Sequence, residues 1–256
     1  MWKIGIQDFL PPLFHRAVRF ADRKINPKPI TPLRIHPFDA LPLNVNPKWI
    51  MDVGANEGHV ADAALQTYAG SNIICFEPVK HTFDILKEKL APYTGRTHLY
   101  NLALSEENMR GEINITSFHG ANSILPQAMF HQVLNPHVRE ISKEEIQLIR
   151  LDDFASSLPA TEIDILKIDV EGYELNVLKG GIDFISNNVD VIIIEISLMR
   201  DESWENQGIF DIFALLNKCG FRLINITDLY YSDRAGDENM MLIQMDCVFR
   251  KKSKLA

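Results

Sequence analysis

Two short stretches of the chain hold acids and glycines at spacings typical of a ligand site. In the first, Asp52 lies near the end of an apolar run, and Gly54 and Gly58 bracket a tight turn before a helical pattern begins. Glycines let the backbone approach a ligand, and the free amides of a new helix point at it. The dinucleotide fingerprint Gly-x-Gly-x-x-Gly is absent. We therefore expect Asp52 to favour a ligand with an ammonium group.

A second acid follows the next apolar run. Residues 72–76 are typical of a buried strand, and Glu77 comes directly after them, 25 residues beyond Asp52. A carboxylate at that place can accept hydrogen bonds from both hydroxyls of a ribose. Alternatively, Glu77 is an acid favoured by a helix dipole, with Pro78 at the first helical position. Both interpretations can hold together. A ligand with a ribose and an ammonium group is S-adenosylmethionine (SAM).

The second stretch, residues 163–172, contains alternating charges. Lys167, Asp169 and Glu171 would share one face of an extended strand. A buried Lys167 needs a partner, and Asp169 and Glu195 are the two candidates. At the strand tip, Asp169 and Glu171 would act as a base toward a hydroxyl, or as ligands of Mg²⁺ together with Glu195. We do not favour the metal, because ligation needs more oxygen groups, and Glu171 is alternatively a helix N-terminal acid.

Five motifs then resemble those of a known family, in order, from about Trp49 to Phe249. They are Asp-Val-Gly-Ala-Asn-Glu-Gly (52–58), Phe-Glu-Pro (76–78), Ala-Leu-Ser (103–105), Leu-Asp-Asp-Phe (151–154) and Leu-Lys-Ile-Asp-Val-Glu-Gly-Tyr-Glu (166–174). The chain is similar to the FkbM-type SAM-dependent methyltransferases, and the last motif is the most specific. The resemblance implies O-methylation of a hydroxyl, often on a sugar, glycolipid or polyketide. We expect the donor to be bound by Asp52, Gly54, Ala55, Asn56, Gly58, Glu77, Pro78, Ala103 and Asp169.

Alternating strands and helices from residue 49 onward predict a doubly wound, mostly parallel α/β sheet of the Rossmann-like kind. Its strands would gather the acids at their carboxyl ends. The resembled class I fold implies seven strands, the last inserted antiparallel beside the fifth. We predict strands at 49–53, 73–76, 97–103, 163–169, 191–196, 221–227 and 241–249, and helices at 58–68, 79–90, 173–185 and 205–219.

Residues 106–151 interrupt this alternation. Residues 112–116 and 146–151 are typical of strands, and a polar stretch lies between them. A loop of this length is typically a lid, a binding loop or a disordered segment, and we predict a lid over the acceptor. It carries His119, His131 and His137. Surface histidines are the commoner case, but His119 is our candidate for holding or deprotonating the acceptor because it follows the first of these strands.

Residues 1–48 precede the motifs. The first 25 residues have the pattern of a basic amphipathic helix, and a proline-rich arm follows. One interpretation is peripheral contact with a membrane through residues 1–25. We favour the other, in which the helix packs on the catalytic domain, residues 49–256, or on a second subunit of a homodimer.

Composition narrows the classes of function. The chain has 256 residues, of which 46% are hydrophobic and 23% charged, as in one larger globular domain. A net charge of −8 argues against a general nucleic-acid binder. Three scattered cysteines show neither a disulfide framework nor metal spacing. With no transmembrane-length run and no signal sequence, we expect a cytoplasmic enzyme acting on a small molecule or glycan.

Two other functions compete with methyl transfer. A nucleotide-dependent oxidoreductase would share the fold class, but the missing glycine fingerprint argues against it. A methyltransferase-like domain that binds SAM without catalysis is the other alternative. The complete set of Asp52, Gly54, Gly58, Glu77 and Asp169 argues against that one.

Overall fold

The computed structural model describes residues 46–125, 138–198, 208–231 and 242–254. The chain divides into two units, residues 1–34 and 35–256, and all the described residues belong to the second. The predicted N-terminal helix and nearly all of the proline-rich arm therefore lie outside the described residues. His131 and His137 lie outside them as well.

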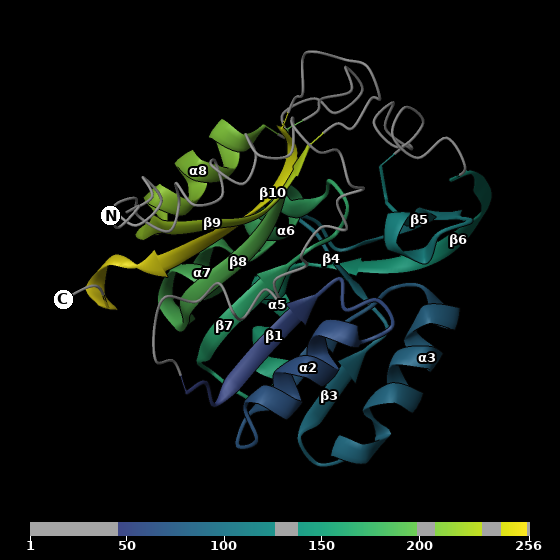
Figure 1. Ribbon diagram of the computed structural model, residues 1–256, viewed down its shortest axis with the longest axis horizontal. Coiled ribbons are helices and arrows are strands. Elements are labelled where there is room, and N and C mark those ends of the chain that lie inside the picture. Colours follow the sequence, from purple (N-terminus) through teal and green to yellow (C-terminus); the bar gives the residue numbers. More distant parts are fainter. Residues whose placement is uncertain (1–45, 126–137, 199–207, 232–241, 255–256) are drawn as a thin grey trace, which may run out of the picture. The chain divides into compact units, whose positions relative to one another are not determined.

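Seven described strands form one sheet in the order β3-β2-β1-β7-β8-β10-β9 (Figure 1). Neighbouring strands run parallel except at β10, which is antiparallel to both β8 and β9. The predicted fold class and the antiparallel last strand are thereby confirmed. The strands are β1 (Trp49–Val53), β2 (Asn72–Phe76), β3 (Thr97–Tyr100), β7 (Ile163–Ile168), β8 (Val189–Ser197), β9 (Phe221–Tyr231) and β10 (Leu242–Lys251).

Helices cover both faces of this sheet because its strands are apolar on both sides. Ile192 and Ile194 of β8 enter one core and Val191 and Ile193 the other, as the two-residue period of a strand requires. The first core is closed by α5 (Leu151–Phe154), α6 (Glu174–Gly180), α7 (Ile182–Asn188) and α8 (Ile209–Lys218). The second is closed by α2 (His59–Thr67) and α3 (Lys80–Leu90).

Some predicted boundaries are wrong. The third strand ends at Tyr100 rather than at residue 103, because Asn101 Nδ2 donates to the carbonyls of Glu77 and Pro78 and turns the chain. The single helix predicted at 173–185 is two short helices, with Gly181 between them. The start predicted at residue 205 for α8 lies outside the described residues.

The interrupting segment forms a sheet of its own. β4 (Ala103–Leu104), β6 (Glu140–Ile149) and β5 (Met109–Thr116) pair in the order β4-β6-β5. Both predicted strands of this segment are present and start earlier than expected, but the second ends at Ile149, because Leu151 already opens α5. Apolar side chains join the small sheet to the region just before α3: Val79, Ala103, Ile113, Ile146 and Leu148.

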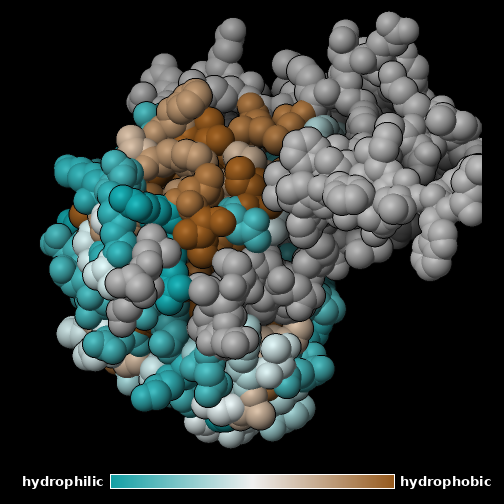
Figure 2. Space-filling model, turned by 60° about the vertical axis from the view of Figure 1, so that its left-hand side comes forward, coloured by the Kyte–Doolittle hydropathy of each residue, from teal (hydrophilic) through white to brown (hydrophobic). Residues whose placement is uncertain are grey.

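The two edges of the large sheet differ. β3 has 4 residues, whereas β9 has 11 and carries several exposed apolar side chains. Figure 2 shows apolar residues gathered on one face of the molecule. The exposed ones on α8 and β9 are Phe210, Leu223, Ile226, Leu229, Tyr230 and Tyr231. Homodimer formation and membrane contact stay predictions. Among the described helices, none has the length and apolar character needed to cross a membrane.

Candidate functional site

The glycine turn after β1 is held by the end of β2. The amides of Gly54 and Ala55 both donate to the carbonyl of Phe76, each at 3.0 Å. Gly54 and Gly58 have φ of 79°, a region that glycine enters at little cost. Gly58 precedes α2 directly, and a Cβ there would lie 2.5 Å from Leu86 Cδ1 of α3. The predicted strand, glycine turn and helix N-terminus are therefore present.

Glu77 lies against this turn with its carboxylate fixed by backbone amides. Its Oε2 accepts from Asn56 N at 3.0 Å and its Oε1 from Val79 N at 2.8 Å. Each carboxylate oxygen can accept more than one hydrogen bond, so both retain acceptor capacity. Burial raises the pKa of Glu77 to about 7 despite the two amides. α3 starts at Lys80, so the prediction that Pro78 is the first helical residue is wrong.

The two predicted stretches meet backbone to backbone. A Cβ on Gly54 would lie 1.8 Å from the carbonyl oxygen of Asp169, which no side chain could tolerate. Asp169 N in turn donates to the carbonyl of Val53 at 3.0 Å. Gly54 is therefore required both by its positive φ and by the close approach of the second loop.

Lys167 lies between two carboxylates from adjacent strands. Its Nζ is 2.9 Å from Asp169 Oδ2 and 3.6 Å from Asp52 Oδ1. Burial alone would lower the pKa of Lys167, but Asp169 and Asp52 outweigh it and hold that pKa above its ordinary value. The predicted pairing with Asp169 is present, and Asp52 is a partner that the sequence did not indicate. Because the side chain of Asp52 is 1% exposed and that of Asp169 is 32% exposed, Asp169 is the more accessible acid.

Asp169, Glu171 and Glu195 bring one carboxylate oxygen each within 4.8 Å of one another. We call these three residues the acidic cluster. Burial, and next the charges of Asp169 and Glu171, raise the pKa of Glu195 well above its ordinary value. Close carboxylates cannot all ionise, so the cluster can hold a proton or accept one. Its oxygens are also of the type that binds Mg²⁺, although three ligands leave an octahedral site incomplete.

Asp246 of β10 extends the acidity of this rim and was missed from the sequence. It pairs with Glu195 in the strand register, and burial followed by the charge of Asp169 raises its pKa to about 7. Glu195 lies within the apolar run 191–196 of β8, and Asp246 follows Met245 and precedes the apolar residues 247–249 of β10. The contrast between each acid and its apolar neighbours was a usable signal for both, and it was used only for Glu195.

Two predicted site residues remain to be placed in the structure, Ala103 and His119. Ala103 is buried in β4 among the apolar side chains of the small sheet, not at the tip of β3. His119 opens a short 3-10 turn, His119–Ala121, and its side chain lies outside the described part of the chain.

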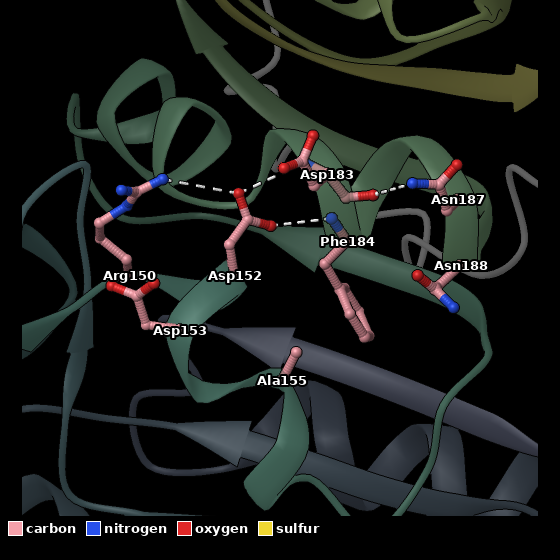
Figure 3. Close-up of a pocket in the computed structure, with 8 residues that line it drawn as sticks. All are labelled: Arg150, Asp152, Asp153, Ala155, Asp183, Phe184, Asn187 and Asn188. Atoms are coloured by element: carbon pink, nitrogen blue, oxygen red, sulfur yellow. Dashed lines mark hydrogen bonds and ion pairs between the residues drawn. The ribbon is translucent and has the colours of Figure 1, made fainter.

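A hollow of about 430 Å³ lies elsewhere, beside α5 and α7, and none of the predicted site residues lines it (Figure 3). There Asp152 Oδ1 accepts from Phe184 N at 2.8 Å, which caps the start of α7. Asn187 and Asn188 on its wall precede the amino end of β8. The acidic cluster lies at the opposite, carboxyl end of that strand, so we assign the hollow a structural role.

Comparisons with known proteins agree with the geometry. A methyltransferase from Sordaria araneosa, sdnD, is 28% identical over 209 residues, which cover 73% of this chain and 78% of that protein. The 2-O-methyltransferase NoeI of Sinorhizobium fredii is 28% identical over 160 residues, covering 60% of this chain and 65% of NoeI. The chain thus spans slightly less than two thirds of NoeI.

A solved FkbM methyltransferase from Methylobacillus flagellatus has the same fold, with a TM-score of 0.52 and 17% identity over 85% of this chain and 48% of that one. The profile of the family described as "Methyltransferase FkbM domain" matches residues 52–223, more than half of the chain. The oxidoreductase and silent-domain alternatives are not favoured by these relatives. The chain therefore belongs to the FkbM methyltransferase family.

Proposed function

We propose that this methyltransferase transfers the methyl group of SAM to a hydroxyl oxygen of a sugar or of another hydroxylated small molecule. The observation that carries the proposal is the contact between Gly54 and the carbonyl of Asp169. A donor bound on the glycine turn would present its reactive end at the acidic cluster. The name of NoeI, a 2-O-methyltransferase, supports oxygen as the acceptor atom.

The donor half of the site consists of the glycine turn and Glu77. The free acceptor capacity on both oxygens of Glu77 suits the two ribose hydroxyls, and the positive end of α2 faces the turn. Asp52, Lys167 and Asp169 together carry a net charge of about −1, which favours a cationic donor over an anionic one. The proposed donor-binding residues are Asp52, Gly54, Ala55, Asn56, Gly58, Glu77 and Pro78. Asp169, which the sequence also suggested for the donor, is assigned to the acceptor half, and Ala103 is left out because it is buried in the small sheet.

The acceptor half consists of the acidic cluster. When bound, SAM supplies a methyl group that is activated by its sulfonium. An alcohol stays protonated at neutral pH, so the cluster has to orient the hydroxyl and take its proton as the new oxygen–carbon bond forms. Asp169, whose backbone meets the glycine turn, orients the hydroxyl, while Glu171 and Glu195 share the proton. His119 stays a candidate for the same task, and we assign no metal.

The small sheet contributes one wall of the acceptor half in this proposal. Ser123, in the segment after β5, donates from its Oγ to the carbonyl of Glu171 at 2.7 Å. Ser123 belongs to the predicted lid, residues 106–151, so this contact would bring part of that segment beside the acidic cluster.

Incubation with methyl-labelled SAM tests this function. The acceptors are a panel of neutral, amino-bearing and uronic methyl glycosides, each with and without EDTA. We expect label on a hydroxyl of at least one glycoside, unaffected by EDTA, and much less label with Glu77→Ala at limiting SAM. Loss of transfer in EDTA and its return with Mg²⁺ would overturn the metal-free assignment. Absence of SAM binding to the wild-type protein by calorimetry would contradict the function itself.

A further inference from the structure

The turn that carries Glu171 has an unusual backbone. Glu171 has φ of 54° and the next residue, Gly172, has φ of 97°. Two successive positive φ values are those of the central pair of a type I′ turn, where Asn or Asp before Gly is preferred. The left-handed region is unfavourable for a glutamate, because its Cβ comes too close to the following carbonyl oxygen. Such a residue persists only where its surroundings hold it in place.

Glu174 supplies two of the contacts that hold the turn. Its Oε1 accepts from Val170 N at 3.2 Å and from Gly172 N at 3.0 Å. These two amides flank Glu171 on either side, and the Glu174 residue is 4% exposed. Paired backbone amides that converge on one anionic oxygen form a nest. The carboxylate of Glu174 thus fixes the direction of the peptide groups on both sides of Glu171.

Ser123 supplies a third contact from outside the turn. Its Oγ donates to the Glu171 carbonyl, and its own carbonyl accepts from Asn114 N at 2.9 Å and from Asn114 Nδ2 at 3.0 Å. Asn114 belongs to β5, so the small sheet anchors Ser123. The turn is therefore bound from within by α6 and from the opposite side by the small sheet.

We propose that Glu174 is a positioning residue. It holds the 170–172 turn so that the carboxylate of Glu171 stays beside Asp169 and Glu195, and Ser123 secures the same turn from the small sheet. This inference rests on the proposed function, because it gives Glu174 a role in the reaction through the acidic cluster.

The acceptor oxygen of Glu174, not its negative charge, is what this role requires. Burial raises the pKa of Glu174 to about 7, so near neutral pH the carboxyl is often uncharged. A glutamine would place a carbonyl oxygen at the same distance from the two amides, whereas an alanine would not. If Glu174 were only a favourable acid at the start of α6, its charge would matter and both variants would behave alike.

Amide hydrogen exchange and carboxyl ¹³C NMR on the wild-type protein, Glu174→Gln and Glu174→Ala test the proposal. In Glu174→Ala we expect exchange at Val170 and Gly172 to accelerate at least tenfold, and the Glu171 carboxyl to titrate as an isolated side chain. In Glu174→Gln we expect exchange within about threefold of wild type and a Glu171 titration still coupled to Glu195. Equal losses in both variants, or no change in Glu174→Ala, would overturn the proposal.

Ser123→Ala keeps the test decisive if Glu174→Ala does not fold. Here the two amides should stay protected while the coupling between Glu171 and Glu195 weakens. Unchanged coupling between Glu171 and Glu195 would contradict the proposal that Ser123 helps to hold the 170–172 turn. None of these measurements requires a methyl acceptor. Their outcome therefore does not depend on whether the proposed function is correct. SAM calorimetry on the same wild-type sample tests that function separately.

Discussion

Carboxylates occur in both halves of this site, but they are held in opposite ways. In the donor half, Glu77 is fixed by two backbone amides, one on each oxygen. In the acceptor half, Asp169, Glu171 and Glu195 have oxygens within 4.8 Å of one another. The first arrangement gives a rigid acceptor of hydrogen bonds. The second gives mutual repulsion and a shared proton. We infer that donor binding depends on the fixed position of the Glu77 carboxylate. Methyl transfer depends instead on the protonation state of the acidic cluster.

Asp169→Asn should have the largest effect of the substitutions considered, because it removes a charge from the acceptor half and should lower kcat. It keeps the side-chain shape but removes the charge, and we expect kcat to fall by roughly 10²–10⁴. Initial rates with a glycoside found to accept methyl groups measure this. Asp164→Asn is the control, because Asp164 lies near the other end of β7 and accepts from the amides of Lys48 and Trp49. A kcat preserved per folded molecule, with a lowered melting temperature, would assign Asp169 to the Lys167 pair alone.

Gly54→Ala should disrupt the close backbone contact between the glycine turn of the donor half and Asp169 of the acceptor half. The new Cβ would meet the carbonyl of Asp169 at 1.8 Å on a backbone with φ of 79°, so we expect a loss of roughly 3 kcal/mol or more in unfolding free energy. Gly95→Ala is the matched control, since Gly95 has φ of 94° and no atom within 4 Å of the added Cβ. It should lose only about 1–2 kcal/mol. Urea unfolding measures both variants. Equal losses of unfolding free energy in Gly54→Ala and Gly95→Ala would show that the glycine turn and the Asp169 loop are not in close contact.

Protonation should affect stability through both halves. The pKa values of Glu77 and Glu174 rise from 4.5 to about 7, with burial as the main cause in each case. The folded chain therefore binds more protons than the unfolded chain between these pH values. The resulting stability is complete below about pH 4.5 and is lost as pH rises through about 7, by roughly 3 kcal/mol per group.

Urea unfolding between pH 5 and 8 measures this slope. Glu77→Gln and Glu174→Gln should each flatten it, and the double variant should flatten it further. A stability that rises over this interval would contradict the raised pKa values.

Glu77→Ala should weaken SAM binding by roughly 1–3 kcal/mol, the range for a lost charge-assisted hydrogen bond to a ligand. Calorimetry with SAM measures this effect. Asp84→Ala is the control, because Asp84 is an acid of α3 that pairs with Lys80 at the surface and is 48% exposed. Wild-type affinity in Glu77→Ala would remove Glu77 from the ribose role.

The donor half could be predicted from the sequence because it is local. Asp52, Gly54, Gly58 and Glu77 lie at the ends of two consecutive strands, and the order of the strands brings them together. The spacing of the glycines already implied the turn and the helix after it. The exact start of α3 was misplaced, because Glu77 binds the amide of Val79 and delays the helix, and Ala103 lies in the small sheet instead of at the tip of β3.

The acceptor half could be predicted only in part because it depends on contacts between distant segments. Glu195 and Asp246 meet through an antiparallel pairing at the far side of the sheet, and Ser123 reaches Glu171 from the small sheet. The positive φ of Glu171 could not be predicted either, since it breaks the strand alternation that the sequence indicated. An acid beside a run of apolar residues was the available signal.

The affinity of Asp169→Asn for SAM tests the division between the two halves most directly. Calorimetry on this variant, beside the wild-type protein and Glu77→Ala, gives the comparison in one titration series. If donor binding belongs to the glycine turn and Glu77, the dissociation constant of Asp169→Asn should stay within about threefold of wild type. A loss as large as that of Glu77→Ala would mean that Asp169 holds the donor, and would contradict the account.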